Sequence, residues 1–403
     1  MGKKKIDTVI KRQGQPDVVI RLAKVQDMRR IQVLYTEVYG ASYSVSIITD
    51  RDKMRQAIED DDHYWLVADC GGRIIGSLVY ALDLRNRISK AFGAVVSQEY
   101  RKLDLAYTMM KLVLDDITSR RDLVDAVYAT TRTANHAPQR LTESLGFVKL
   151  GIFPNTHKVH ENETHCLTAY FPERALARRR KRPYLVEEIV PFYSLVRKQM
   201  DLEKPFVSGL RPDPSFFSSV RNSQMDFEVI TAPEFIKNRW KSFVSGSFFQ
   251  HTVMPFHDPN LLFITPDQKT EVYLHYNTKD KYSVVLGGDT DRPEAAVVLE
   301  NIANKVNEMG MAYVEVIVDA YTPEVQRHAL EARFIPSGYF PAIKKVGGKR
   351  YDCIVFSRTF EMLDFRNVRL ISLYKNFLRE YLRLWQESYI NLAFKKDEKK
   401  KRP

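Results

Sequence analysis

The sequence contains one pattern twice, at a constant separation of 187 positions (326 − 139 = 187). The matched residues of the first copy are Gln139-Arg140, Phe147, Gly151, Phe153, Pro154, Lys158-Val159 and Cys166. Those of the second copy are Gln326-Arg327, Phe334, Gly338, Phe340, Pro341, Lys345-Val346 and Cys353. An offset without gaps over this stretch predicts two copies of one fold joined in tandem.

Length and composition agree with two domains. A chain of 403 residues exceeds the size at which a single hydrophobic core stops growing, and an apolar fraction of 44% is that of a globular protein. No apolar run approaches the roughly 18 residues of a membrane span. The N-terminus, Met1 to Lys5, lacks the apolar core of a secretory signal. We therefore expect a cytoplasmic protein.

Three cysteines, Cys70, Cys166 and Cys353, are too few and too widely spaced for a disulfide framework or a zinc site. They favour a reducing compartment, and we expect no bound metal.

The net charge of +12 is concentrated partly in three basic runs, at residues 3–5, 178–182 and 395–402. They are interpreted either as solvated linkers and tails or as attraction to an anionic partner such as a phosphorylated cofactor or a carrier protein. The runs lack interleaved aromatic residues, and the chain shows no nucleic-acid module signature. Both observations argue against a nucleic-acid partner.

Hydrophobic periodicity predicts a mixed α/β sheet in each copy. In the first copy, strands are expected at 18–23, 64–68, 74–80, 91–97, 124–131 and 147–153. Helices are expected after Asp27, which could cap the first of them, and at 104–118 and 138–145. In the second copy, strands are expected at 227–230, 261–264, 272–276, 282–286 and 313–319, with a helix at about 293–309.

The expected domain boundaries follow from these elements and from proline and glycine positions. They are a basic extension at 1–17, a first domain with a trailing helix at 18–200, a linker at 201–226, a second domain at 227–360, a C-terminal helix at 361–394 and a basic tail at 395–403. The apolar stripe of the C-terminal helix predicts packing on its own domain, and the alternative is a dimerisation surface.

Two segments of the first copy carry a cofactor pattern. One is Val95-Val96-Ser97-Gln98-Glu99-Tyr100-Arg101-Lys102-Leu103-Asp104-Leu105-Ala106, between a predicted strand and a predicted helix. The other runs from Asn135-His136 to Gly146-Phe147. With these segments, residues 18–171 resemble the GNAT acetyltransferase superfamily. The fold of that family is a mixed sheet whose fourth strand splays from the fifth and admits acetyl-CoA.

The resemblance implies that acetyl-CoA is the co-substrate. Amide groups at a helix start would cradle its pyrophosphate, helped by Arg101 and Lys102. The implied binding residues are Val95, Val96, Arg101, Lys102, Leu103, Asp104, Leu105, Ala106 and Asn135. Asp104 departs from the family, because it occupies the place of the first glycine. Its carboxylate would repel pyrophosphate if it pointed inward, whereas outward it could cap the helix. The alternative is a capped amphipathic helix that binds no phosphate.

The reaction implied by the resemblance is acyl transfer to an amine, which requires a base because an ammonium cannot attack. Candidates are His136, whose unperturbed pKa of about 6.5 is suitable, and Glu99. Thr142 stands where the family usually has a proton-donating tyrosine, so that role is in doubt or moves to Tyr100, Tyr107 or Tyr128.

Further residues could border the acceptor, which is expected to be a small-molecule amine or a protein amine. His157, His160 and His165 lie close in sequence with Glu161 and Glu163, so a polar hairpin is expected and a metal site is the alternative. Tyr35, Tyr39 and Tyr43 could line the same pocket or belong to the core.

The second copy lacks the cofactor loop. Gly287-Gly288-Asp289-Thr290-Asp291-Arg292 holds two acidic residues and one basic residue, which disfavour a pyrophosphate. We therefore expect two tandem GNAT-like domains, the second degenerate, in an N-acetyltransferase. The alternatives are a non-catalytic acyl-CoA-binding or scaffold protein and a carrier-protein-dependent acyltransferase.

Overall fold

The computed structural model describes residues 6–40, 45–158, 161–211, 220, 222–242, 256–291 and 295–391. The chain divides into two compact units. The first comprises residues 1–130, 140–147 and 169–175, and the second comprises 131–139, 148–168 and 176–403. Among the helices described, none has the length and apolar character needed to cross a membrane.

The sheet of the first unit confirms the predicted mixed α/β fold. Its strands lie in chain order: β1 (Asp7–Ile10), β2 (Val18–Leu22), β3 (His63–Cys70), β4 (Arg73–Asp83), β5 (Ile88–Val96) and β6 (Ala126–Arg132). Neighbours pair antiparallel up to β5, and β5 pairs parallel with β6. Strand β1 lies within the expected basic extension, so residues 7–10 of that extension form an edge strand.

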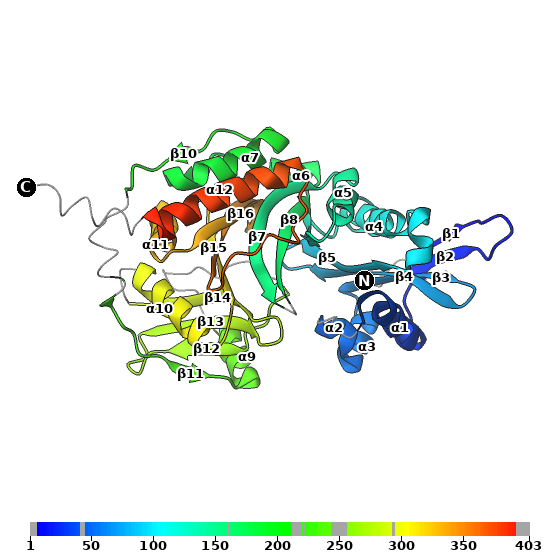
Figure 1. Cartoon of the computed structure of the whole chain (residues 1–403), viewed down its shortest axis with the longest axis horizontal. Coiled ribbons are helices and arrows are strands. Elements are labelled where there is room, and N and C mark those ends of the chain that lie inside the picture. Colours follow the sequence, from blue (N-terminus) through cyan, green and yellow to red (C-terminus); the bar gives the residue numbers. More distant parts are fainter. Residues whose placement is uncertain are drawn as a thin grey trace, which may run out of the picture. The chain divides into compact units, whose positions relative to one another are not determined.

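Helices cover both faces of this sheet (Figure 1). On one face lie α1 (Met28–Tyr39), α2 (Ser46–Thr49) and α3 (Arg51–Glu59), and on the other lies α4 (Leu105–Asp115). Strand β3 supplies both cores because its side chains alternate: Tyr64 and Leu66 pack with α4, whereas Trp65 and Val67 pack with α1 and α3. The continuous apolar run in β3 therefore reflects a strand buried on both faces.

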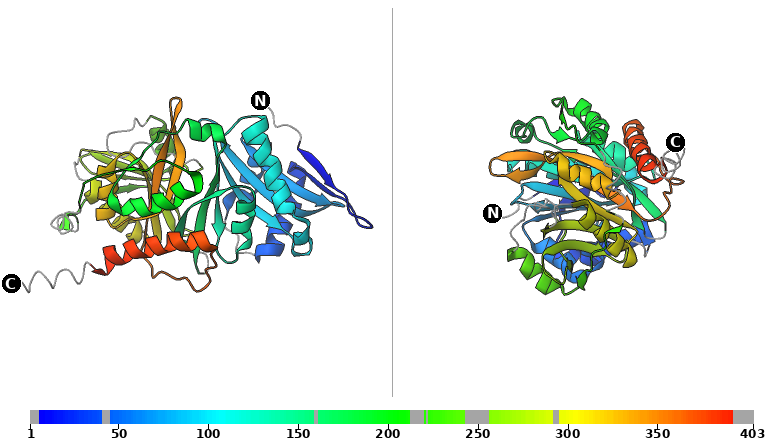
Figure 2. Two further views of the ribbon diagram at one scale, coloured as in Figure 1. Left: turned by 90° about the horizontal axis from the view of Figure 1, so that it is seen from above. Right: turned by 90° about the vertical axis from the view of Figure 1, so that its left-hand side faces the viewer.

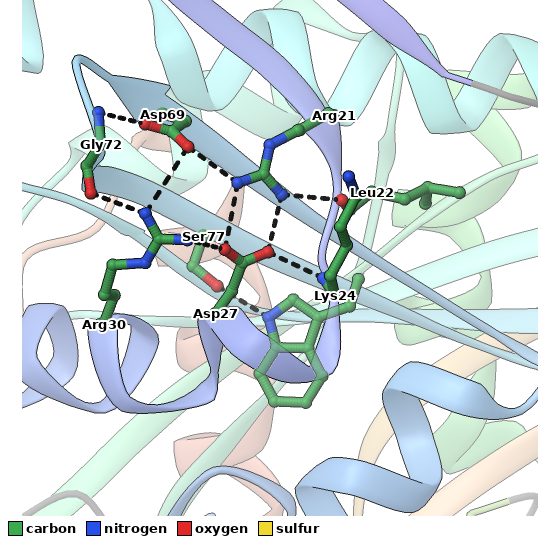
Figure 3. A network of polar contacts seen from close by, with 9 residues as sticks. Arg21, Leu22, Lys24, Asp27, Arg30, Asp69, Gly72 and Ser77 are labelled. Atoms are coloured by element: carbon green, nitrogen blue, oxygen red, sulfur yellow. Dashed lines mark hydrogen bonds and ion pairs between the residues drawn. The ribbon is translucent and has the colours of Figure 1, made fainter.

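Asp27 does not cap α1 in the expected way. It stands at the N-cap position without a side-chain capping bond. Its fully buried carboxylate instead accepts a hydrogen bond from the Lys24 amide at 2.8 Å and binds Arg21 (2.6 Å) and Arg30 (Figure 3). Arg21 also binds Asp69 at 2.7 Å. This network ties the start of α1 to β2 and β3.

The second unit contains the last hairpin of the first copy and the whole second copy. Its strand order is β8 (Asn162–Tyr170), β7 (Val148–Lys158), β16 (Ile335–Val346), β17 (Lys349–Thr359), β15 (Tyr313–Asp319), β14 (Tyr282–Thr290), β13 (Thr270–Asn277), β12 (Leu261–Ile264) and β11 (Glu228–Ile230). Strands β11 to β14 pair antiparallel, and β14 pairs parallel with β15. This is the pairing pattern of β2 to β6.

The repeated sequence falls on matching elements. A shift of 187 places β6 on β15, helix α5 (Ala137–Ser144) on α11 (Pro323–Glu331), β7 on β16, and β8 on β17. Helix α10 (Ala295–Glu308) joins β14 to β15 as α4 joins β5 to β6, and α9 (Pro233–Ser242) comes after β11 as α1 comes after β2. Agreement of element types is what a duplication requires, and the duplication itself stays a prediction.

Strands β7 and β16 meet at equivalent residues. Gly151 pairs antiparallel with Gly338, its counterpart in the repeat. A Cβ atom added to Gly151 would lie 2.2 Å from the Ser337 carbonyl oxygen, so only glycine allows this approach. Pairing of equivalent positions in opposite directions is a local two-fold arrangement.

Two buried glutamines extend this symmetry. The side chain of Gln139 donates to the Arg369 carbonyl (2.7 Å) and accepts from the Ile371 amide (3.1 Å). Gln326 donates to the Tyr184 carbonyl (3.0 Å) and accepts from the Val186 amide (3.1 Å). Each copy's glutamine therefore holds the segment that leads into the helix trailing the other copy.

Those two helices are α7 (Val190–Met200) and α12 (Ser372–Tyr389), which lie side by side (Figures 1 and 2). Phe192 and Phe377 are in contact, with ring centroids 6.2 Å apart. The apolar stripe of α12, Tyr374, Phe377, Tyr381 and Leu384, is buried within the chain. Packing on its own chain therefore accounts for the stripe, and a dimer through another face of α12 stays a prediction.

Candidate cofactor and active site

The central feature of the candidate site is a gap between β5 and β6. Their parallel pairing covers Ile88 to Lys90 against Ala126 to Tyr128, while both strands, described along their whole length, continue beyond these residues. Strand β5 carries an irregularity opposite Leu78, and Gly93 has φ +65° there. A bulge bends its strand and redirects the residues beyond it, so β5 leaves its neighbour.

The loop after β5 is compact. Residues Gln98–Leu103 form a 3-10 turn, Asp104 adopts a left-handed conformation (φ 50°, ψ 29°), and α4 begins at Leu105. Asp104 is exposed and makes no capping hydrogen bond, so the expected cap is absent. Its backbone has the conformation that glycine adopts most readily, which explains how aspartate occupies this place.

Arg101 and Lys102 provide the positive charge of the loop. Both side chains are exposed, and neither forms an ion pair with another described residue. They stand next to the amino end of α4, whose first amides and dipole favour an anion. Val95, by contrast, is buried in the core with α1 and α3, and Leu105 in the core with α4. Only part of the expected binding stretch is therefore open to a ligand.

A polar network that the sequence analysis missed fixes the end of β5. The buried Ser97 hydroxyl donates to Glu37 of α1 at 2.7 Å, and Arg73 donates to Glu37 at 3.1 Å and to Glu99 at 3.3 Å. The hydrogen bonds from Ser97 and Arg73 lower the pKa of Glu37. No local pattern marks Glu37, because its partners lie 36 and 60 positions away.

The two candidate bases differ in setting. Glu99 is 70% exposed and ion-paired with Arg73. His136 is exposed, belongs to the second unit and directly precedes α5. Its neighbour Asn135 accepts a hydrogen bond from the Ala137 amide at 2.9 Å, so its side chain organises the start of α5. The structure thus keeps Val95 to Ala106 together in one unit and places Asn135 and His136 together in the other.

Sequence comparison finds a family match for one part of the chain. Residues 26–147 match the acetyltransferase (GNAT) family model, and this span holds the gap, the loop and α4. Residues 26–147 are a GNAT acetyltransferase domain.

No curated protein matches the chain. Among solved structures, an acetyltransferase of the GNAT family from Streptococcus pneumoniae is 18% identical, with 38% of this chain and 99% of that chain covered and a TM-score of 0.34. A ribosomal-protein-S5-alanine acetyltransferase from Vibrio fischeri is 16% identical, covering 41% and 98%, with a TM-score of 0.35. A variant of the spermidine N-acetyltransferase from Vibrio cholerae is 16% identical, covering 38% and 94%, with a TM-score of 0.33.

Within the GNAT domain, the position of the usual tyrosine is closed to solvent. Thr142 is 3% exposed. Of the replacements considered, Tyr100 lies under Arg12 (5.3 Å to the ring centroid) and Tyr128 lies near Lys90 (6.0 Å). Tyr107 is half-buried against the core beneath α4.

Tyr35 belongs to the core rather than to an open pocket. It is 2% exposed, and its hydroxyl donates to the Gly93 carbonyl at the bend of β5. Tyr39 stacks on it with ring centroids 6.3 Å apart, and Tyr43 lies outside the described residues.

The histidine-rich hairpin is a polar cluster, as expected. His157 and His165 have ring centroids 4.8 Å apart, and His160 lies outside the described residues. His165 is 3.1 Å from Glu163, which also binds Arg132 at 2.9 Å. Burial alone would raise the pKa of Glu163, but its bonds to His165 and Arg132 lower it to about 2.

The corresponding place in the second copy has the opposite charge. Strands β14 and β15 also part early, after Val285 and Val316. The end of β14 carries Asp289, and Asp291 directly follows this strand. A groove of about 500 Å³ beside the turn between β12 and β13 is lined by Asp226, Asp267, Asp291 and Lys269, among other residues. Three carboxylates against one ammonium disfavour a pyrophosphate there.

Proposed function

We propose that this protein transfers an acetyl group from acetyl-CoA to an amine, using the GNAT domain. The observation that carries the proposal is that β5 and β6 stop pairing early, and that the chain continues from β5 into the loop with Arg101, Lys102 and the start of α4. The pantetheine arm would lie along the free edge of β5. The pyrophosphate would lie over residues 101–106, where amides and two cations can hold it.

The chemistry needs one bond formed and one broken. The amine nitrogen attacks the thioester carbonyl, the carbon–sulfur bond breaks, the ammonium proton passes to a base, and the thiolate of CoA takes up a proton. His136 is the leading base, because an imidazole nitrogen can accept the proton of an ammonium. Glu99 is the second candidate, although Arg73 competes with a substrate for its carboxylate.

Charge reversal at the loop tests the cofactor site. Arg101→Glu should weaken acetyl-CoA binding about 10-fold or more, because a charge-assisted bond to phosphate becomes a repulsion. Arg55→Glu, at an exposed position in α3, is the matched control and should bind normally. Calorimetric titration measures both. Equal affinities for the two variants would rule out the loop as the pyrophosphate site.

We further propose that the second copy arose by duplication and does not bind CoA. The acidic groove supports this asymmetry. Titration should give one acetyl-CoA per chain, and Asp289→Ala or Asp291→Ala should leave the affinity unchanged. Two sites per chain would contradict the asymmetry without affecting the first site.

A non-catalytic acyl-CoA-binding role is the second candidate. It is favoured by the buried Thr142 in place of the usual tyrosine and by the exposure of Glu99 and His136. Release of thiol, measured with a panel of small amines and peptides across pH, separates the two. Tight CoA binding with no turnover of any amine would favour binding alone. Turnover only with an acylated carrier protein would favour the carrier-dependent reaction.

A further inference from the structure

The basic run at residues 178–182 is part of a built surface of the second unit. Residues Arg180, Lys181, Arg182, Tyr184, Phe206, Val207 and Tyr321 line a groove of about 460 Å³. We name it the Arg180 groove. Its residues come from the end of the first copy, the expected linker and the second copy. The sequence alone showed only the charges.

The backbone under these cations is held in place. The Arg180 amide donates to the Arg350 carbonyl (2.8 Å), and the Tyr184 amide donates to the Ala320 carbonyl (2.9 Å). Strand β9 (Tyr184–Leu185) pairs with β10 (Phe206–Val207). Arg179 points inward, where it is buried and bound to Asp352. Four of the five residues of this run are therefore exposed, as a solvated segment would be, but the backbone beneath them is fixed by hydrogen bonds.

Aromatic rings interleave with the cations in space. The Arg180 guanidinium lies 4.4 Å from the ring centroid of Tyr321, and that of Arg182 lies 5.6 Å from the ring centroid of Phe206. A guanidinium stacked on a ring keeps its N–H donors in its own plane, where they can reach a phosphate. Among the described contacts, neither guanidinium has an acidic partner, whereas Lys181 binds Glu203 at 3.3 Å.

The groove also presents apolar and aromatic surface to solvent. Tyr184 is 40% exposed, Phe206 54% and Val207 53%. Exposed rings beside fixed cations are the combination that binds single-stranded nucleic acid, since cations follow the phosphates and rings stack on bases. An acidic peptide would use the charges but has no planar faces for the rings. In a duplex the faces of the bases are stacked on one another, so they are not available to contact the rings.

We propose that the Arg180 groove is a binding site for single-stranded nucleic acid. It is separate from the GNAT loop, and the proposal does not depend on acetyl transfer. The missing aromatic residues, which argued against nucleic acid in the sequence, are supplied by the fold from positions up to 141 residues away.

Fluorescence anisotropy of the full chain with a labelled 12-nucleotide oligouridylate tests the proposal. About three phosphate contacts predict an affinity that falls roughly 20-fold between 50 and 200 mM salt. Arg180→Glu with Arg182→Glu should weaken binding at least 10-fold and reduce the salt dependence. Tyr184→Ala with Phe206→Ala should weaken it about 10-fold with the salt dependence unchanged, because stacking is lost and charge is kept.

The matched control is Lys237→Glu with Lys241→Glu, which makes the same charge change at exposed positions in α9. It should bind the oligonucleotide like the unaltered chain. Arg180 and Arg182 are exposed, so their reversal should leave the thermal unfolding midpoint and the acetyl-CoA affinity unchanged. Three results would each overturn the proposal. The control variant could lose as much affinity as the Arg180 and Arg182 variant, a 12-residue polyglutamate could compete as well as unlabelled oligouridylate, or a duplex of 12 base pairs could bind as tightly as the single strand.

Discussion

Asp104 replaces the glycine of the family pattern and still adopts the left-handed backbone conformation that glycine favours. Both sequence-based alternatives gave the side chain a role, either repelling phosphate or capping α4. The structure gives the decisive property to the backbone, which is left-handed at this residue, while the carboxylate is exposed. Aspartate tolerates this conformation better than most residues, and β-branched residues tolerate it worst.

Two substitutions at Asp104 should therefore act in opposite directions. Asp104→Gly should keep or strengthen acetyl-CoA binding, because it removes a negative charge and fits the same backbone. Asp104→Val should weaken binding, because the loop must change its conformation to accept a β-branched residue. Calorimetric titration compares them. A strong loss with Asp104→Gly would mean that the carboxylate itself is required.

The buried Asp27 is the clearest electrostatic determinant of stability in the first unit. Asp27→Asn should lower the free energy of unfolding by about 1–3 kcal/mol, since it removes the charge that Arg21 and Arg30 share while Asp69 still binds Arg21. Urea denaturation measures the change. The control is Asp61→Asn, at an exposed position, which should stay within about 0.5 kcal/mol. A small effect at Asp27 would show that water replaces the carboxylate.

The same residue predicts a pH dependence. Burial alone would raise the pKa of Asp27, but the bonds from Arg21 and Lys24 and the charge of Arg30 lower it below the unfolded value of about 3.9. A depressed folded pKa adds stability above pH 4 that disappears as the pH falls through the folded value. The stability difference between the unaltered chain and Asp27→Asn should thus shrink below pH 4. A constant difference down to pH 2 would assign the effect to packing.

At the scale of elements, the sequence predicted what local patterns encode. The strands expected at 124–131, 147–153 and 313–319 and the helix expected at 138–145 correspond to β6, β7, β15 and α5. The family resemblance implied that these two strands, β5 and β6, separate, but no local pattern located the bend at Gly93 or the residues where β5 and β6 stop pairing. Nor did the sequence predict the partners of Gln139, because these lie 230 and 232 positions away. Long-range hydrogen bonds leave no periodic signal.

The reciprocal glutamines give a matched pair of tests. Gln139→Leu and Gln326→Leu each remove bonds to a carbonyl and an amide, which should cost about 1–3 kcal/mol for each buried group left unpaired. Urea denaturation should show similar losses in the two variants. Gln199→Leu serves as the comparison. Gln199 is a half-buried residue of α7, and its substitution removes a hydrogen bond from the Lys149 amide within the first copy. Very different losses at Gln139 and Gln326 would mean that the two glutamines contribute unequally to the free energy of unfolding, although their hydrogen bonds are equivalent.

At the scale of the whole molecule, β7 of the first copy pairs with β16 of the second copy as two identical subunits would pair in a symmetric dimer. A shortened chain ending at residue 226 would lose β16 and expose the edge of β7. It should therefore associate with a second copy of itself, with Gly151 facing Gly151. Light scattering should find dimers of the shortened chain, and Gly151→Val should abolish them. A stable monomer would show that β7 needs no partner.

The pairing of Gly151 with Gly338 also has an evolutionary meaning under the proposed duplication. In an assembly of identical subunits, every mutation appears in both members, so a cofactor loop cannot be kept in one and lost in the other. Once the two are encoded by one chain, each half changes independently while the interface stays nearly symmetric. The acidic segment at the end of β14 and the cationic loop after β5 are a kind of divergence that such a linked pair permits.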